Sequence, residues 1–484
     1  MAKHSAEPRS RADLLGEAAE LELSHGLVPR RLREAYAAEL ACADALLQEG
    51  HRAAAAGSAV KALMLAFHRV PHLDGLTSPL AEDPAGFTAP MRRSPALKAI
   101  AKPRGRKEPA APTPDGRPLR LLVVHRANAN FLPLITDHYE QHADVEVRVL
   151  DLAADPELAP LARGLQRMVG RSLGSQVPFG HEVEAALRPH LDWADTVFVE
   201  WCAFGAAFLT LVDPGTARVV VRLHSYEAFT YWPYLTDFSR VDDLIFVSDH
   251  VRDLVTASVP RLSAANGPRL HVIHNALELS AYRRPKQPEA RFTLGLVGVS
   301  QVAKDPRWAV EVLRRLREHD DRYRLVLIGG DLDPETGPAV RAYHDQLEKE
   351  LAGLVSSGAV RRVGQTDDVP AALQEIGVML NSSVREGFPC GFVEGAASGA
   401  VPVIRDWPFF AGRRHGARTV FPQEWVARTP EEAARRVLAC TATEEAWSEE
   451  GRAAAEHALS SWDWAVVRKD FDQLLLGSRR KVQH

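Results

Sequence analysis

Short apolar runs that alternate with helix-length segments constrain the fold of this chain more than any other feature. A first series of these runs lies between residues 119 and 275, and a second lies between residues 292 and 406. Runs such as LRLLVVH, RVVVRLH and YRLVLIGG are continuous in Val, Leu and Ile. Continuous runs are typical of parallel strands that helices cover on both faces. The sequence therefore predicts two doubly wound α/β domains in tandem, with ligands bound beyond the carboxyl ends of the strands.

Two further regions precede these series. Residues 1–83 contain three Ala- and Leu-rich helical segments, of which the second and third resemble one tetratricopeptide hairpin. A single hairpin cannot bury its apolar face alone, so it must pack on the rest of the chain or on another subunit. Residues 84–118 are rich in Pro and Ala, with seven basic and no acidic residues between positions 92 and 107. This composition predicts a solvated linker, with contact to anionic lipid head groups or a polyanionic acceptor as the alternative.

The length, net charge and cysteine content of the chain narrow the class of protein. The length of 484 residues allows about three domains of ~100–200 residues each, and the formal net charge of −4 argues against a general nucleic-acid binder. The four cysteines lie far apart, and Asp242 and Asp243 lack the DxD spacing, so we expect no metal site and no disulfide framework. No signal peptide and no apolar run of about 18 residues is evident. We expect a cytoplasmic protein.

The stretch REGFPCGFVEGAASGAVPV, residues 385–403, carries the strongest chemical signal. It follows a strand that ends in polar residues, and a helix is expected to begin near Pro389, because proline suits a first helical turn. Free backbone N–H groups of Cys390, Gly391 and Phe392 would then form an anion site, which Gly391 lets a ligand approach closely. The small residues that follow would let the helix lie close to the sheet.

Two glutamates, Glu386 and Glu394, lie on either side of this helix start. A carboxylate accepts hydrogen bonds from hydroxyl groups but repels phosphate. Two carboxylates that flank an anion site therefore suit a diphosphate with a hydroxylated ring at each end. The pattern favours a nucleotide sugar as the ligand.

The segment EGFPCGFVE followed by GAASGAVPV resembles the E-x7-E element of the family 4 retaining glycosyltransferases, which have the GT-B fold. Other segments resemble the same family: FTLGLVGVSQVAKDP (292–306), HVIHNALELSAY (271–282), VVVRLHSYE (219–227), LIFVSDHVRDLV (244–255) and SSWDWAVVRKDFDQLL (460–475). The resemblance covers residues 119–475 and leaves residues 1–118 unexplained.

The resemblance implies a GT-B architecture in which two Rossmann-like domains face a cleft, with the helical region and the linker in front of them. The expected ranges are residues 119–285 for the N-terminal, acceptor domain, 286–460 for the C-terminal, nucleotide-sugar donor domain, and 461–484 for a closing helix that returns to the first domain and ends in a basic tail.

The resemblance also implies roles for single residues. Glu386 would contact the hydroxyls of the donor sugar, and Glu394 would contact the ribose. Lys304 would bind the diphosphate and, with the helix start, stabilise the charge that develops as the diphosphate departs. Gly298, at a strand end, would line the donor site. His224, at a strand end of the first domain, would lie near the transferred sugar and the acceptor, so Glu386, His224 and Lys304 are the expected catalytic residues.

The chain departs from the family pattern at several positions. Val299 stands where the family usually has an arginine, and Arg307 or an arginine of the first domain is the expected substitute. The first strand-to-helix loop, HRANANF, lacks the usual glycines. Its Asn128 and Asn130 could bond acceptor hydroxyls, although Asn is also common in loops for local turn reasons.

We therefore expect a hexosyltransferase-like glycosyltransferase that moves a sugar from a nucleoside diphosphate sugar to a glycan, a lipid-linked acceptor or a small molecule, with retention of configuration. It would need no cofactor beyond its donor substrate, no metal and no nucleic acid. Two further expected partners are a protein bound by the N-terminal helices and an anionic membrane touched peripherally by residues 92–107. The alternatives are a GT-B sugar-nucleotide epimerase, and a non-catalytic scaffold in which Val299 marks a decayed donor site.

Overall fold

The computed structural model describes residues 2–476 of the chain, with side chains from residue 9 onward. The described chain forms two compact units. The first unit comprises residues 2–69, 83–273 and 469–476, and the second comprises residues 70–82 and 274–468. The basic tail expected at the end of the chain lies outside the described residues.

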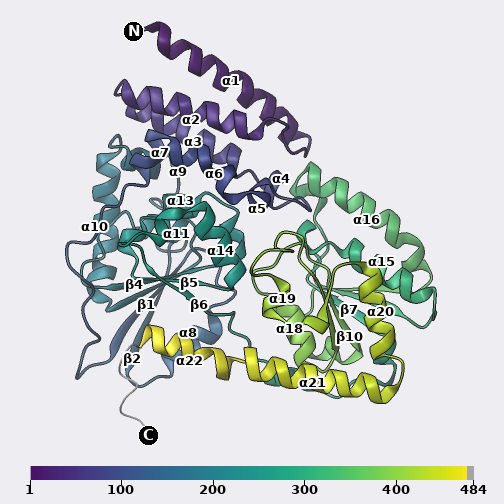
Figure 1. Cartoon of the computed structure of the whole chain (residues 1–484). Helices are drawn as coiled ribbons and strands as arrows, with labels where there is room; N and C mark the ends of the chain where they lie inside the picture. Colours follow the sequence, from purple (N-terminus) through teal and green to yellow (C-terminus); the bar gives the residue numbers. More distant parts are fainter. Residues whose placement is uncertain (1, 477–484) are drawn as a thin grey trace. The chain divides into compact units, whose positions relative to one another are not determined.

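A parallel sheet of six strands forms the centre of the first unit, in the order β2-β1-β3-β4-β5-β6 (Figure 1). The strands are β1 Leu119–His125, β2 Val145–Asp151, β3 Thr196–Glu200, β4 Arg218–Leu223, β5 Asp243–Phe246 and β6 Arg269–Val272. The helices between them are α8 Pro133–Glu140, α9 Leu165–Ser172, α10 Val177–Trp193, α11 Phe204–Leu209, α12 Ser225–Ala228, α13 Trp232–Leu235 and α14 Asp249–Ser258. Every residue of β3 and β5 is buried, as the continuous apolar runs predict for a doubly covered sheet.

The second unit has the same plan, with a parallel sheet in the order β12-β11-β10-β7-β8-β9. Its strands are β7 Thr293–Val297, β8 Arg324–Ile328, β9 Val360–Gly364, β10 Val378–Asn381, β11 Val401–Arg405 and β12 Val426–Ala427. Its helices are α15 Pro306–Arg317, α16 Pro338–Ser356, α17 Val369–Ala372, α18 Cys390–Ala397, α19 Ala417–Val420, α20 Pro430–Cys440 and α21 Glu444–Trp462. Two tandem doubly wound units with an N-terminal helical region confirm the predicted fold class.

The small residues of α18 allow this helix to lie on its sheet. A Cβ atom added at Gly391 would come within 2.7 Å of Val297 Cγ1 in β7, and one added at Gly395 would come within 2.3 Å of Met379 Cε in β10. Neither distance is compatible with a real side chain, so both positions need glycine. The close helix–sheet packing predicted from the run of small residues is confirmed.

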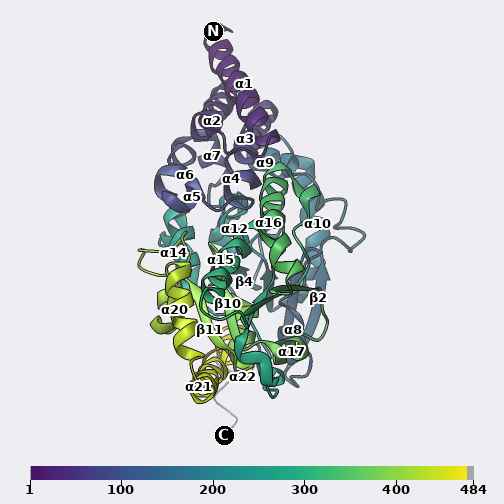
Figure 2. The ribbon, with the colours of Figure 1, turned by 90° about the vertical axis from the view of Figure 1, so that its right-hand side faces the viewer.

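The N-terminal helices α1 (Ala2–Ser24), α2 (Leu32–Gln48) and α3 (Arg52–Ala66) lie side by side, and α3 packs on α9 of the first unit (Figures 1 and 2). The hairpin therefore packs on the rest of its own chain, which is the first of the two expectations. The next residues, 70–82, belong instead to the second unit.

The prediction of a linker at residues 84–118 is wrong for the first half of this stretch. Residues 84–118 begin with two helices, α6 (Pro84–Arg93) and α7 (Pro95–Ile100), and each starts with a proline. The N-cap Ser94 accepts a hydrogen bond from the backbone of Leu97 at 3.2 Å. Because proline is tolerated in a first turn, prolines that suggested a linker here mark two helix starts.

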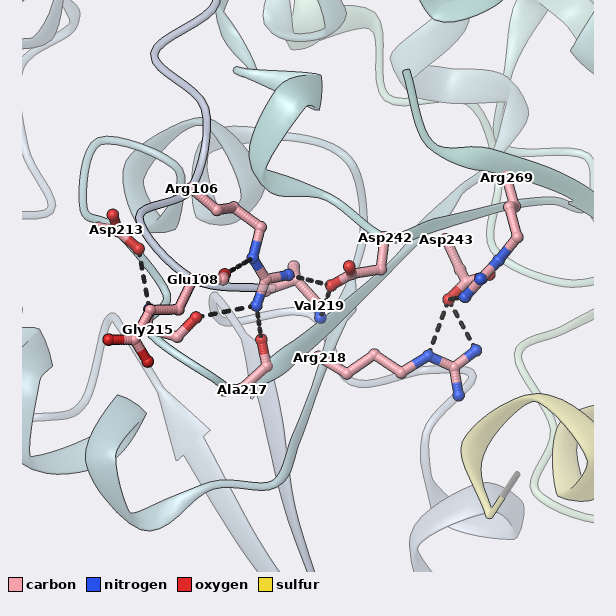
Figure 3. A network of polar contacts seen from close by, with 10 residues as sticks. All are labelled: Arg106, Glu108, Asp213, Gly215, Ala217, Arg218, Val219, Asp242, Asp243 and Arg269. Carbon is pink, nitrogen blue, oxygen red and sulfur yellow. Dashed lines mark hydrogen bonds and ion pairs between the residues drawn. The ribbon is translucent and has the colours of Figure 1, made fainter. Parts of the chain in front are cut away.

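The second half of this stretch is extended but bonded to the first unit. The guanidinium group of Arg106 pairs with Asp242 and donates to the carbonyl oxygens of Gly215 at 3.0 Å and Ala217 at 2.6 Å (Figure 3). The backbone N–H of Lys107 donates to Asp213 Oδ2 at 2.9 Å. This part of the chain is therefore an extended segment that is bonded to the first unit, and not a free linker.

Asp243 begins β5 and joins three basic side chains. Its carboxylate accepts hydrogen bonds from Arg218 and Arg269 at 2.7 to 2.9 Å (Figure 3). It also accepts one from His271 at 2.8 Å, and its own side chain is buried. Burial alone would raise the pKa of Asp243, but the hydrogen bonds of His271 and Arg269 and the charge of Arg218 hold this pKa well below its usual value. Neighbouring Asp242 pairs with Arg106, so the aspartate pair has a structural role.

Several basic residues of the 92–107 stretch point inward. Arg92 donates to Thr88 Oγ1 and to the carbonyl oxygen of Ala85, each at 2.6 Å. Burial lowers the pKa of Arg104. The other basic residues of the stretch, Arg93, Lys98, Lys102 and Lys107, are exposed. Within residues 2–476, no helix combines the length and the apolar character needed to cross a bilayer.

The final helix, α22 (Trp464–Leu475), belongs to the first unit from Lys469 onward. Asp472 on this helix accepts hydrogen bonds from Tyr139 Oη at 3.2 Å and lies 3.0 Å from His138 Nε2. The two units divide at residues 273 and 274, before the expected boundary at 285 and 286.

Candidate functional site

The carboxylate of Glu386 lies at the centre of a hydrogen-bonded cluster in the second unit. Glu386 Oε1 accepts hydrogen bonds from Lys304 Nζ at 2.7 Å, Asn381 Nδ2 at 3.2 Å and Ser383 Oγ at 2.6 Å. Burial would raise the pKa of Glu386, but the charge and hydrogen bond of Lys304 lower it below its usual value. The structure therefore brings together two of the residues predicted as catalytic, as a partly buried ion pair at the carboxyl edge of the sheet.

The turn that carries Lys304 is held in a strained conformation. Asp305, directly after Lys304, has φ = +41°, in the left-handed region that non-glycine residues rarely adopt. Its carboxylate accepts hydrogen bonds from Tyr343 Oη and from Arg405 Nη1, both at 2.7 Å. These two bonds hold Asp305 at the start of α15 and so fix the backbone next to Lys304. Gly298, at the end of β7, has φ = +78°, which favours glycine.

Two hydrogen bonds join the lysine turn directly to the loop that carries Glu386, and Arg405 bridges the two segments. Ser382 Oγ donates to the carbonyl oxygen of Lys304 at 2.5 Å, and the backbone N–H of Val384 donates to Ala303 O at 2.8 Å. Arg405 Nη1, which also binds Asp305, donates to Ser382 O at 3.1 Å. The separation of the lysine and the glutamate is therefore set by backbone contacts as well as by their own ion pair.

Sequence reasoning missed most of these supporting residues. Asn381, Ser382 and Ser383 form the polar strand end that preceded the predicted loop, so their type gave a signal. Tyr343 and Arg405 gave none, because they lie 38 and 100 residues from Asp305 in the chain.

The helix start at Cys390 differs from the expected anion site. The backbone N–H of Cys390 donates to Phe388 O at 3.0 Å, and that of Phe392 donates to Pro389 O at 3.0 Å. Two of the three N–H groups expected to be free are therefore used, because the loop turns tightly before the helix and brings these carbonyl oxygens under it. The expectation of three free donors at Cys390, Gly391 and Phe392 is wrong.

The side chains at the helix start also serve the structure. Phe392 is buried and packs on Phe421, with ring centroids 5.3 Å apart. Cys390 Sγ accepts a hydrogen bond from Asn275 Nδ2 at 3.3 Å, and burial raises the pKa of this thiol to about 12. Cys390 is therefore a neutral thiol.

Glu394 is paired with a tyrosine that sequence reasoning did not single out. Burial raises the pKa of Glu394, and a hydrogen bond from the hydroxyl of Tyr282 partly offsets that rise. Burial and the neighbouring charge of Glu394 likewise raise the pKa of Tyr282, which therefore stays protonated and donates. The carboxylate expected to bind a ribose is thus oriented by Tyr282.

The departure at Val299 has a structural explanation, and the expected substitute Arg307 has a partner within the second unit. Val299 is 4% exposed and belongs to the apolar core of the second unit, two residues after the end of β7. Arg307, the expected substitute cation, forms an ion pair with Glu350, with Nη2 2.7 Å from Oε1.

In the first unit, His224 lies directly after β4, as expected, but it is buried. Its Nε2 lies 2.6 Å from Glu200 Oε1, and its ring contacts both Phe131 and Trp201, with centroids 4.9 and 4.1 Å away. Burial lowers the pKa of His224 although the charge of Glu200 opposes this effect. Glu200 also pairs with Arg222 at 3.3 Å. His224 is therefore a neutral ring fixed by an internal charge pair.

A second buried carboxyl group lies beside His224. Glu227 Oε1 accepts hydrogen bonds from the backbone N–H groups of Cys202 at 2.9 Å and His224 at 3.3 Å. Burial raises the pKa of Glu227 to about 8, so the group is protonated at neutral pH. Trp201, at the end of β3, has φ = +70°. No sequence signal marked this cluster.

Asn128 forms the kind of local turn that was weighed against an acceptor role. Its Oδ1 accepts a hydrogen bond from the backbone N–H of Asn130 at 3.1 Å, and both residues are exposed.

Within the part of the chain that the structure describes, no three His, Cys, Asp or Glu side chains are grouped as ligands of a metal ion.

Comparisons with known proteins bear on the class of protein to which this chain is similar. Residues 291–441, which contain Lys304, Glu386 and Glu394, match the model of the family described as Glycosyl transferases group 1. No curated protein sequence matches the chain.

Solved structures share the fold. Anabaena Alr3699/HepE in complex with UDP and glucose aligns with a TM-score of 0.53 at 14% identity, over 74% of this chain and 100% of that chain. A UDP-forming trehalose-phosphate synthase from Burkholderia xenovorans aligns with a TM-score of 0.54 at 13% identity, over 74% of this chain and 99% of that chain. At these identities the likeness shows the fold alone, which is GT-B. The family match and the fold together support a GT-B glycosyltransferase.

Proposed function

We propose that this protein transfers a sugar from a nucleoside diphosphate sugar to a hydroxyl group of an acceptor. In the reaction the bond between the anomeric carbon and the diphosphate breaks, a bond to the acceptor oxygen forms, and the acceptor proton passes to the departing diphosphate. The chemistry requires a cation beside the leaving group and a hydrogen-bond acceptor beside the sugar. Lys304 supplies the first and Glu386 the second.

The observation that carries the proposal is the 2.7 Å pair of Lys304 and Glu386 within the segment that matches the glycosyltransferase family model. Glu386 is buried, the side chain of Lys304 is 26% exposed, and three hydrogen bonds fix the loops that carry the pair. A donor would bind with its diphosphate on Lys304 and its sugar hydroxyls on Glu386. Glu394, oriented by Tyr282, is then proposed to bind the ribose.

The finer features of the proposal are family 4 membership, retention of configuration, a hexose as the transferred sugar, and metal independence. Retention follows if the acceptor attacks from the side of the departing diphosphate, which needs no carboxylate nucleophile. His224 is proposed to contact the transferred sugar or the acceptor, and its low pKa suits a neutral hydrogen-bonding role. Asn128 and Asn130 stay proposed acceptor contacts, and the exposed basic residues of the 92–107 stretch a proposed contact with anionic membranes.

The first donors to test are UDP-sugars, because Alr3699/HepE is a structure with UDP and glucose and the Burkholderia enzyme is UDP-forming. Calorimetry with a panel of UDP-, GDP-, ADP- and dTDP-sugars measures binding, and mass spectrometry with glycan, lipid-linked and small-molecule acceptors measures transfer. The expected result is binding of one donor class and a glycosylated product whose anomeric configuration NMR shows to be retained.

Two variants with a matched control sharpen this test. Lys304→Met and Glu386→Gln should each reduce transfer by at least 100-fold, on the scale of losing one electrostatic contact to a transition state. Lys349→Met, at an exposed lysine of the same unit, should leave transfer unchanged. Turnover of the donor without an acceptor would favour the epimerase, and absence of binding by every donor would favour the scaffold.

A further inference from the structure

A pocket with a volume of about 760 Å³ lies in the second unit at the C-terminal end of α18. Three segments form its walls: residues 283–285, residues 397–399, and α21 from Arg452 to Ser460. The end of α18 leads into β11, which begins at Val401, so the pocket lies at the amino edge of the sheet. The pair of Lys304 and Glu386 lies at the carboxyl edge, so this pocket is separate from the proposed donor site.

The walls of the pocket carry more positive than negative charge. They contain Arg283, Arg284 and Arg452 but one carboxylate, that of Glu456. Arg452 pairs with Glu456 at 2.7 Å and Arg284 with Asp368 at 3.3 Å, and these four side chains are 40% to 64% exposed. Such exposed pairs contribute little, so both arginines can take a ligand as partner at low cost. The guanidinium group of Arg283 has no hydrogen-bond or ion-pair partner among the described residues 9–476.

A further basic side chain lies behind these walls. Lys286 Nζ donates to Ser398 Oγ at 2.8 Å and to the carbonyl oxygen of Leu373 at 2.7 Å. Both partners are neutral, and burial lowers the pKa of Lys286 to about 7. An anion in the pocket would favour the charged form of this amine. Four basic side chains thus lie in or behind walls that carry one carboxylate.

The remaining walls are largely apolar, with Pro285, Ala397, Ala455 and Leu459 among the lining residues. A ligand that uses both kinds of wall combines an anionic group with an organic body. Arginine binds phosphate through paired N–H donors, and a phosphate monoester carries a charge of about −1.5 to −2 at neutral pH. Three arginines and one glutamate leave two positive charges in the walls, which matches this charge. The volume is also typical of small-molecule sites, which are roughly 300–1,000 Å³.

We propose that this pocket binds a phosphate monoester and that the bound ester strengthens donor binding. Its phosphate is held by the three arginines, and its organic part lies on the apolar walls. The site requires neither Lys304 nor Glu386. Binding of the ester is therefore independent of the proposed function, whereas its effect on the donor rests on that function.

The effect on the donor follows from how the walls connect to Glu394, the carboxylate proposed to bind the ribose. Arg283 directly follows Tyr282, whose hydroxyl donates a hydrogen bond to Glu394. The backbone N–H of Ser398 donates to Glu394 O at 2.9 Å. An ester that joins Arg283 to α21 fixes the segment that carries Tyr282. Glu394 is then held in its position toward the donor.

Calorimetry without donor tests the site with glycerol 3-phosphate, glucose 6-phosphate and dihexanoyl phosphatidic acid, and with glucose as the uncharged control. We expect at least one ester to bind with one site per chain, and glucose not to bind. Binding of a soluble ester assigns a metabolite, and binding of the phosphatidic acid alone assigns a lipid head group.

Three variants locate the bound ester. Arg283→Gln combined with Arg452→Gln should weaken ester binding at least about tenfold, because two charge-assisted contacts are lost. Both side chains are exposed, so the fold should be unchanged. Ala455→Phe places a bulky side chain on the pocket wall and should also weaken binding, which diffuse surface charge would not explain. The control Arg341→Gln removes an exposed arginine that pairs with a glutamate elsewhere in the same unit and should change nothing.

The effect on the donor is measured with the nucleotide sugar identified by the panel. A saturating ester should raise donor affinity about fivefold, within the usual range of coupling between sites. Tyr282→Phe should remove this increase and leave ester binding intact. Equal donor affinity with and without the ester would overturn the coupling.

The site itself is overturned if no ester binds, if the double arginine variant binds the ester as tightly as wild type, or if Lys304→Met abolishes ester binding. The last result would place the ester in the donor site. If the wild-type protein binds no nucleotide sugar, the proposed function fails. The ester titrations, made without donor, still decide whether the pocket is an anion site.

Discussion

Arg405 is the side chain whose loss should most clearly separate a supporting role from a catalytic one. It ends β11, and its Nη1 binds both Asp305 Oδ2 at 2.7 Å and Ser382 O at 3.1 Å. The first contact holds the strained turn after Lys304, and the second holds the loop that leads to Glu386. Replacement by Gln removes the charge and shortens the side chain, so both contacts are lost.

The expected cost can be worked from these contacts. A hydrogen bond between charged groups contributes about 1.5–3 kcal/mol, and one to a neutral carbonyl about 0.5–1.5 kcal/mol. The side chains of Arg405 and Asp305 are 17% and 9% exposed, so water reaches the pair in part and the lower half of the summed range applies. The free energy of unfolding should therefore fall by about 2–3 kcal/mol, which urea denaturation followed by circular dichroism measures.

The functional consequence is a loss of donor binding without removal of any group that touches the donor. We expect the dissociation constant for the donor to rise about tenfold in Arg405→Gln, since each 1.4 kcal/mol of lost organisation is a factor of ten. Arg436→Gln is the matched control, because the side chain of Arg436 is 16% exposed and pairs with Glu450 at 3.1 Å on helices that do not carry the site. If Arg405→Gln loses stability but binds donor as wild type does, the reasoning that these bonds organise the site is refuted.

Three other changes test separate parts of the structure. Tyr282→Phe removes the hydrogen bond that lowers the pKa of Glu394, so donor affinity should fall about fivefold. The pH at which donor affinity declines on the acid side should also rise, because the pKa of Glu394 rises; calorimetric titrations at several pH values measure this shift. An unchanged acid-side decline would contradict the pairing of Tyr282 with Glu394. Glu227→Gln should remove a pH dependence of stability. The pKa of Glu227 is about 8 in the folded protein and about 4.3 when unfolded, so wild-type stability falls as pH rises between these values. Urea midpoints of the variant and the wild type that run parallel from pH 5 to 8 would exclude a neutral Glu227. Arg106→Met leaves the carboxylate of Asp242, 20% exposed, without its partner and should lower the free energy of unfolding by about 3 kcal/mol in urea denaturation; a change below 1 kcal/mol would support the original expectation of a free tether.

The strands were predictable because a strand that is buried on both faces of its sheet has a continuous apolar sequence, which can be recognised locally. Continuous apolar runs predicted both parallel sheets, and the run of small residues predicted how closely α18 lies on its sheet, since Gly391 and Gly395 have no room for a Cβ atom. Lys304 and Glu386 could be chosen because each follows a strand end in a segment with a recognisable spacing. Each of these inferences uses only the residue types within one short stretch of the sequence.

Features that depend on distant pairs were not predictable in the same way. Arg106 was grouped with a basic linker because its partner Asp242 lies 136 residues away. Residues 70–82 could not be assigned to the second unit from the sequence, because Leu76 carries no local sign of the apolar core against which it packs. The expected free N–H groups of Cys390 and Phe392 failed for a local reason, the tight turn before the helix, whose backbone conformation residue types alone do not specify.

The pairing of cations with carboxylates in the second unit has a consequence for how a donor binds under the proposed function. Arg307 is held by Glu350 and Arg405 by Asp305, while Lys304 is held by Glu386, a residue that also has a role toward the sugar. A diphosphate that takes Lys304 therefore removes the cationic partner of a buried carboxylate. The carboxylate keeps its hydrogen bonds from Asn381 and Ser383, but it replaces the lost bond only when sugar hydroxyls reach it. Binding of the phosphate half and the sugar half is coupled through one ion pair, so the complete donor is favoured over the free nucleoside diphosphate that the reaction leaves behind.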